Sequence, residues 1–282
     1  MNKKIVFIVM IILTCIPMQQ VAAFETYLDF QAGVSIPISY GLSAPFHDRD
    51  GIDVQLNGYW ENPGIQDISG KFGINAGWWV NDDPNNFMSH FGSNFNFSYN
   101  RLDFQKSMGN FNMSVTNIPF GPIRQDEAVG SMIFSSRGDL FTVAHLFNYR
   151  QGVMPDKQSP FGRLQFNFGI GPALMINKQE FATSNIVTFN ASGKPGQPSP
   201  VEQKFDSQTD VSFGLMAQLG ATYFLTKNIY MKASLDYRYF KSSFNMIGDG
   251  ITHDNRIDKT FVSQLNYDNN LFGFNIGIGI QF

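Results

Sequence analysis

The sequence has 282 residues, of which 15% are charged, and its formal net charge is −3. Soluble proteins carry roughly 25% charged residues, and a weakly acidic chain lacks the basic surface of a general nucleic-acid binder. Phenylalanine and glycine are abundant, at 29 and 26 residues, yet the mean hydropathy is only −0.15. After the N-terminal segment there is no apolar run of roughly 18 residues, so we expect no membrane-spanning helix.

The first 23 residues have the pattern of a secretory signal peptide. Lys3 and Lys4 supply a positive start, Ile5–Leu13 is almost entirely apolar, and Val21–Ala23 offers the small residues that a signal peptidase reads. We therefore predict cleavage after residue 23. The only cysteine, Cys15, lies inside this segment, so the mature chain is expected to contain no disulfide.

Eight segments of the remaining chain alternate between apolar and small or polar residues, as β-strands with two different faces do. They cover residues 24–36, 68–80, 88–104, 139–150, 162–177, 211–225, 229–240 and 274–282. Seven show a distinct apolar face. The segment 139–150 is ambiguous, because both of its faces are largely apolar.

The connections between these segments alternate in length. Short links with turn chemistry cover residues 81–87, 151–161 and 226–228, whereas the other links are long. This is the pattern of bacterial outer-membrane barrels, which have short periplasmic turns and long external loops. We predict an all-β, antiparallel, up-and-down barrel of eight strands over residues 24–282, with four long external loops. A ten-stranded barrel, with Val54–Trp60 and Phe111–Phe120 as extra strands, is the alternative.

Four stretches resemble the OmpA-like and opacity-type family of eight-stranded outer-membrane barrels. They are Thr26–Ile36, Phe166–Leu174 (FNFGIGPAL), Gly214–Phe240 and Gly273–Phe282. The resemblance covers the strands and leaves the long loops unmatched, so it implies a fold and not an activity. Because the sequence stops at the last strand, we expect no periplasmic peptidoglycan-binding domain of the OmpA type.

The final strand resembles the sorting signal that the barrel-assembly machinery reads, which makes this machinery an expected partner. The predicted signal consists of alternating apolar residues that end on an aromatic residue: Phe274, Ile276, Ile278, Ile280 and Phe282. These residues would face lipid, while the small and polar residues between them would line the lumen.

Charged residues recur on the predicted lumen face. The set consists of Glu25, Asp29, Lys71, Arg163, Lys232, Asp236 and Arg238. Side chains fill the interior of an eight-stranded barrel, and buried charges must be paired. We therefore favour a salt-bridged plug over a gated polar path for small solutes.

Aromatic residues near the strand ends predict an interface belt, where amphipathic rings prefer the headgroup level. The predicted belt consists of Trp78, Trp79, Tyr223, Tyr237 and Tyr239.

Catalysis and metal binding find little support in the residue pattern. Ser89 and His90 are adjacent and would point to opposite faces of a strand, and His145 lies mid-strand as a packed or lumen histidine. The acidic run His47–Asp53 lacks calcium-loop spacing and reads as a charged turn. We expect no catalytic residues, no metal and no cofactor.

The long loops are the predicted functional regions, because binding usually resides in loops on a rigid scaffold. Their large apolar residues are Phe46, Tyr59, Trp60, Phe111 and Phe120. The sequence predicts a surface-exposed scaffold for adhesion, host interaction or envelope integrity, with outer-membrane lipid, lipopolysaccharide and a host-surface ligand as partners. A narrow porin-like channel is the alternative, and a lipid-modifying enzyme is the third hypothesis.

Overall fold

The computed structural model describes residues 25–43, 46–48, 53–61, 68–116, 128–155, 159–191, 194–195, 199–251 and 257–282. Side chains are described for residues 25–37, 68–103, 135–155, 159–182, 205–245 and 268–282. The predicted signal peptide lies outside the described residues. No helix in the described part of the chain is long and apolar enough to cross a membrane.

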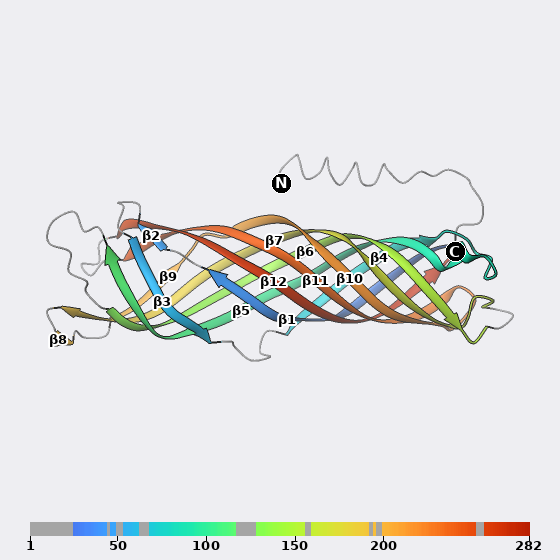
Figure 1. Cartoon of the computed structure of the whole chain (residues 1–282), viewed down its shortest axis with the longest axis horizontal. Helices are drawn as coiled ribbons and strands as arrows, with labels where there is room; N and C mark the ends of the chain where they lie inside the picture. The colour runs from blue at the N-terminus through green and yellow to red at the C-terminus, as the bar shows by residue number, and fades with distance from the viewer. Residues whose placement is uncertain are drawn as a thin grey trace.

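Twelve strands and one short 3₁₀ helix make up the described chain (Figure 1). The strands are β1 (Glu25–Ser43), β2 (Phe46–Asp48), β3 (Asp53–Glu61), β4 (Ser69–Trp79), β5 (Phe91–Thr116), β6 (Ala128–Val153), β7 (Leu164–Ala191), β8 (Lys194–Pro195), β9 (Ser199–Lys204), β10 (Gln208–Phe224), β11 (Ile229–Ile251) and β12 (Ile257–Gln281). The 3₁₀ helix η2 (Phe87–His90) precedes β5.

Eight of the strands form a closed antiparallel barrel. Each of β1, β4, β5, β6, β7, β10, β11 and β12 pairs with the next in this order. The barrel closes where β1 pairs with β12, from Tyr27 opposite Gln281 to Ser43 opposite Asn266. The predicted eight-stranded up-and-down barrel is therefore confirmed.

Three short strands lengthen the barrel at the end opposite the tight turns. Along β12, β2 follows β1 as the paired strand, β3 follows β4 along β5, and β9 follows β10 along β7. The strands also run far into the segments that the sequence predicted as loops, since β6 begins at Ala128 and β7 ends at Ala191. The result is an elongated barrel (Figure 1).

The ten-stranded alternative identified real strands but assigned them the wrong place. Residues 53–61 do form β3, and Phe111–Thr116 is the C-terminal end of β5, which is remote from the tight turns. Residues 117–120 lie outside the described chain. Because β3 pairs with β5 only above the last β4–β5 pair, it lengthens the barrel and does not widen it.

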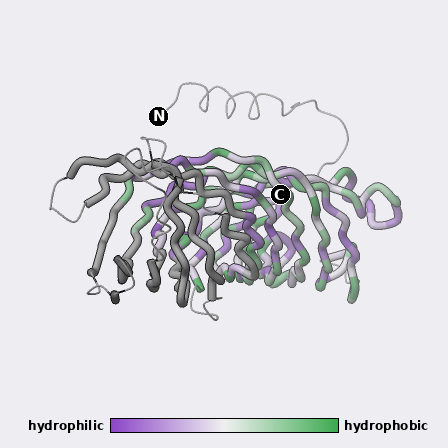
Figure 2. Tube along the Cα trace, turned by 60° about the vertical axis from the view of Figure 1, so that its left-hand side comes forward, coloured by the Kyte–Doolittle hydropathy of each residue, from purple (hydrophilic) through white to green (hydrophobic). Residues whose placement is uncertain are grey.

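Alternation gives the barrel an apolar outside. Hydrophilic and hydrophobic residues alternate along the described strands (Figure 2), and large side chains such as Phe72, Phe213 and Ile276 are exposed. On β11 the outward residues from Ile229 to Tyr239 span ten residue steps, about 33 Å of strand. At a tilt of about 40° this gives an apolar band about 25 Å tall, the height of the lipid-facing band of outer-membrane barrels.

Candidate functional site

The lumen is filled in layers, and the lowest layer lies at the end with the tight turns. Arg150 is fully buried and forms an ion pair with Glu25. Its guanidinium lies 4.4 Å from the centre of the Trp79 ring and 3.9 Å from that of Phe161. Trp79 also stacks on Tyr27 at 5.8 Å. An ion pair covered by aromatic rings thus forms the floor of the lumen at the end with the tight turns.

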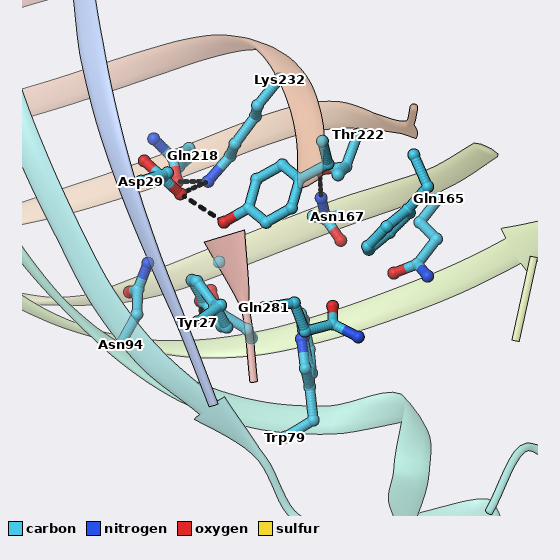
Figure 3. A pocket seen from close by; sticks show the side chains of 14 residues that line it. Tyr27, Asp29, Trp79, Asn94, Gln165, Asn167, Gln218, Thr222, Lys232 and Gln281 are labelled. Atoms are coloured by element: carbon cyan, nitrogen blue, oxygen red, sulfur yellow. Dashed lines mark hydrogen bonds and ion pairs between the residues drawn. The ribbon is translucent and has the colours of Figure 1, made fainter. Parts of the chain in front are cut away.

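A polar layer lies directly above this floor (Figure 3). Asp29 is fully buried and accepts hydrogen bonds from the Lys232 Nζ, at 3.4 Å, and from the Tyr230 hydroxyl, at 3.4 Å. It also accepts one from the amide of Asn75, at 2.6 Å. The cavity beside Asp29, Tyr230 and Lys232 is only about 20 Å³, which is room for about one water molecule.

A charged cluster occupies the centre of the barrel. Asp236 forms ion pairs with the Lys71 Nζ, at 2.5 Å, and with the Arg238 Nε, at 3.1 Å. It also accepts a hydrogen bond from the Asn275 amide, at 2.7 Å. The Arg238 guanidinium donates further to the Ser35 hydroxyl, at 2.8 Å. Four different strands therefore meet through one carboxylate and one guanidinium.

A cluster of apolar side chains packs in the lumen beside the charges, since Met216 and Leu271 lie opposite Arg238 on the neighbouring strands. It comprises Leu102, Leu140, Ala144, Leu146, Ala173, Met175, Met216, Phe240 and Leu271, which are all buried. This cluster explains why the segment 139–150 was ambiguous in the sequence. Its even-numbered apolar residues face the lumen, while Phe141 and Phe147 face outward with 48% and 61% of their surface exposed.

The predicted lumen charges are brought together with one exception. Glu25, Asp29, Lys71, Lys232, Asp236 and Arg238 all lie inside the barrel and form ion pairs. Arg163 lies outside the strands, in the turn before β7, where its backbone N–H donates to the Met154 carbonyl. Sequence reasoning missed Arg150, because its strand showed no distinct polar face from which a lumen side could be assigned.

The predicted interface belt needs one correction. Tyr223, Tyr237 and Tyr239 face outward near the two edges of the apolar band, and Trp78 is half-buried beside Phe95. Trp79, in contrast, is 5% exposed and points into the lumen. Adjacent residues on a strand face opposite sides, so Trp78 and Trp79 could not both face the lipid.

The last strand has the predicted two faces. Phe274, Ile276, Ile278 and Ile280 are exposed outward, and Phe282, just beyond the strand, is also exposed. Asn275 is buried and donates to Asp236. A role of this strand as an assembly signal remains a proposal.

One polar pair lies on the lipid-facing side. The Ser93 hydroxyl is 2.6 Å from the His145 Nε2, and the imidazole stacks on Phe95 and meets Phe147 edge-on. The sequence gave no sign of this contact, because the two residues lie 52 positions apart and meet only through the β5–β6 register. The distance suits a nucleophile and its base, but only 8% of Ser93 is exposed. We therefore interpret the pair as a hydrogen bond through which two polar groups on the lipid-facing side satisfy each other.

Metal ligands do not gather in the part of the chain that the structure describes. No group of three or more histidine, cysteine, aspartate or glutamate residues there could hold a metal ion. Side chains of the acidic run His47–Asp53 lie outside the described set.

The barrel is closed and has an apolar outer band. Its tight turns, the start of β1 and the end of β12 lie at the same rim. These features define the class of protein. This chain is an outer-membrane β-barrel protein of the bacterial cell envelope.

Comparisons with known proteins add the fold and little more. No protein-family model and no curated protein matches the chain. Solved structures similar to it include the outer membrane protein OprG from Pseudomonas aeruginosa, with 12% identity, a TM-score of 0.39 and coverage of 93% of this chain and 97% of that one. Ail of Yersinia pestis, solved with a heparin analogue, has 11% identity, a TM-score of 0.36 and coverage of 92% and 99%.

The outer membrane protease OmpT from Escherichia coli is also similar, with 11% identity, a TM-score of 0.31 and coverage of 93% of this chain and 99% of that chain. Scores this low carry no argument about activity, and no family match supports the OmpA-like resemblance.

Proposed function

We propose that this protein is a closed, non-conducting scaffold at the cell surface. The observation that carries the proposal is the filled lumen. The lumen holds aromatic rings, buried polar side chains, a charged cluster and buried apolar side chains, and the cavity beside Asp29 is only about 20 Å³. An ion crossing this interior would have to break buried ion pairs and pass between buried apolar side chains, and both steps are costly.

The extension of the barrel supports a role outside the membrane. On β5, the strand continues from Asp103 to Thr116 above the apolar band, which is about 40 Å of strand. Rigid strands of this length would hold the connecting segments away from the lipid surface. We infer that this projecting part serves adhesion, host interaction or envelope integrity by binding a host-surface ligand. The barrel-assembly machinery is the second proposed partner, through the last strand.

Single-channel recording tests the closed lumen directly. The mature chain, residues 24–282, would be refolded into detergent, its folding checked by heat-modifiable gel mobility, and its conductance measured in a planar bilayer. We expect folded protein without steady conductance. Stable, reproducible openings would overturn the scaffold and favour the channel. Substitution of Lys232 by glutamine should then change ion selectivity, because Lys232 would line the open path.

Single-cysteine labelling tests the orientation. Cys15 lies in the predicted signal peptide, so Ser131→Cys, on the upper part of β6, and Asn228→Cys, in a tight turn, would each be the only thiol of the mature chain. A membrane-impermeant maleimide on intact cells should label the first variant and not the second. The reverse pattern would contradict the proposed orientation, and mass spectrometry of the same samples would show whether the mature chain begins after Ala23.

A further inference from the structure

A histidine faces the lipid deep within the apolar band. The strand register leads from Ile229, at the edge of the band near the tight turns, around the barrel to Tyr239, at the opposite edge, in eight steps of one strand each. Because the strands tilt, each step rises by an equal height. His145 lies five steps from Ile229. In a band about 25 Å tall, it is therefore about 16 Å from one edge and about 9 Å from the other.

Only one of the two ring nitrogens of His145 has a hydrogen-bond partner. Its Nε2 lies 2.6 Å from the Ser93 hydroxyl, whereas its Nδ1 forms no hydrogen bond with any of the described residues. The side chain is half-buried, and Nδ1 is accessible from outside the barrel. Neither water nor a polar lipid group is present at this depth, so an unpaired ring nitrogen costs free energy there.

Ser93 can support either tautomer of the imidazole. When the ring proton is on Nδ1, the Ser93 hydroxyl donates to Nε2. When the proton is on Nε2, the Ser93 oxygen accepts it, and the hydroxyl can turn its own hydrogen to the Leu146 carbonyl, 3.3 Å away. The exposed Nδ1 is a donor in the first state and an acceptor in the second.

The neighbouring strand is irregular at the same place. The β6–β7 ladder omits His145 and Leu146 and is resumed on both sides of them. Its register places Pro172 opposite His145, and a proline has no N–H to give to the backbone across a strand pair. Pro172 is exposed on the outside of the barrel. The wall thus loses backbone hydrogen bonding where a polar side chain faces the lipid.

We propose that this face of β5, β6 and β7 binds a second copy of the same chain, with the two His145 side chains hydrogen-bonded through Nδ1. Both copies cross the membrane in the same orientation, so the two-fold axis of the dimer is parallel to the bilayer normal. A residue on that axis meets its own copy at the same depth. One histidine in each tautomer completes an Nδ1–H···Nδ1 bond, and each imidazole keeps its own Ser93.

The choice of a second copy follows from the solvent. Apolar contact alone does not drive association in a membrane, because acyl chains are as apolar as the side chains they would leave. Around His145 the outward residues Phe147 and Ile170 are 61% and 41% exposed, and the polar contact would decide where two such surfaces meet. A second copy supplies a matching nitrogen at the required depth, and this contact is independent of whether the lumen conducts.

Energy transfer between labelled copies in lipid vesicles tests this contact. Asn228→Cys, in a tight turn, gives the mature chain one thiol for a donor or an acceptor dye, and transfer is measured while the protein-to-lipid ratio is raised. The test variant adds Ser93→Ala and His145→Leu, which leave no polar side chain at the contact. Ile276→Ala is the matched control, since Ile276 is exposed on β12, four strands away from β6 in either direction around the barrel.

The labelled protein without these changes should show more transfer than random proximity gives. The test variant should lower its association constant about three- to tenfold, and the control should stay within about twofold. Donor-labelled protein mixed with the acceptor-labelled test variant should also associate weakly, because one histidine cannot complete the bond. Transfer at the random level in the unchanged protein would overturn the dimer. Equal association of the test variant would overturn this face as its interface. Heat-modifiable mobility would show that every variant is folded.

Discussion

The two faces of the same strands handle polar groups in different ways. Inside the barrel, charges such as Asp236 and Arg238 are fully buried and share partners from several strands. On the outside, within the apolar band, Ser93 and His145 satisfy each other across one pair of strands. Above the band, Lys241 and Asp268 form an exposed ion pair. The surroundings thus decide how much each polar contact contributes to stability.

The location of a residue in the barrel therefore predicts the effect of its substitution better than the residue type does. The Asp236 carboxylate in the lumen pairs with two buried cations, whereas the Asp268 carboxylate above the band is exposed to solvent. Three substitutions test this difference, and each can be measured from the urea-dependent folding equilibrium of the mature chain in lipid vesicles.

Asp236→Asn should have the largest effect. The change leaves the Lys71 ammonium and the Arg238 guanidinium without their shared carboxylate in the lumen, and breaking a buried ion pair costs about 3–5 kcal/mol. Asp268→Asn, which breaks the exposed pair with Lys241, is the control and should leave the midpoint unchanged. Equal effects of the two substitutions would mean that the lumen is solvated, which would also weaken the closed-scaffold proposal.

Gly279→Ala should come next. Gly279 lies on the lumen face of β12, and a Cβ atom there would overlap the ring of Tyr230, which packs against the bare backbone. Overpacking of an interior of this kind costs about 2–3 kcal/mol. Gly70→Ala is the matched control, since a Cβ at Gly70 meets nothing within 4 Å. A negligible effect at Gly279 would show that the polar layer around Tyr230 is loosely packed.

Ser93→Ala should have a smaller effect. It removes the partner of the His145 imidazole on the lipid-facing side, and an unsatisfied polar group there costs about 1–2 kcal/mol. The double variant Ser93→Ala with His145→Phe should recover most of this loss, because no polar group is left unpaired. The unmodified protein should not react with a fluorophosphonate, since Ser93 is covered. Reaction at Ser93 that is lost in His145→Ala would instead support the lipid-modifying enzyme.

Prediction from sequence succeeded where the hydropathy of a residue decides which face of its strand it occupies. Alternation located all eight barrel strands, and it gave both faces of the closing strand from Phe274 to Ile280 correctly. It failed where a strand has two apolar faces, as in residues 139–150, and Arg150 was missed for that reason. The alternation pattern also predicted strands that are too short, because the start of β6 and the end of β7 contain many polar residues on both faces.

The alternating faces, the turns and the class of barrel follow from the sequence alone, since these depend on residues that are neighbours along the chain. The pairing of the charges, the inward orientation of Trp79 and the contact between Ser93 and His145 depend on the three-dimensional fold. These contacts join residues tens to hundreds of positions apart, such as Lys71 and Asp236 at a separation of 165. Their partners are set by the register between strands and by closure of the barrel, and no local pattern of residues encodes either one.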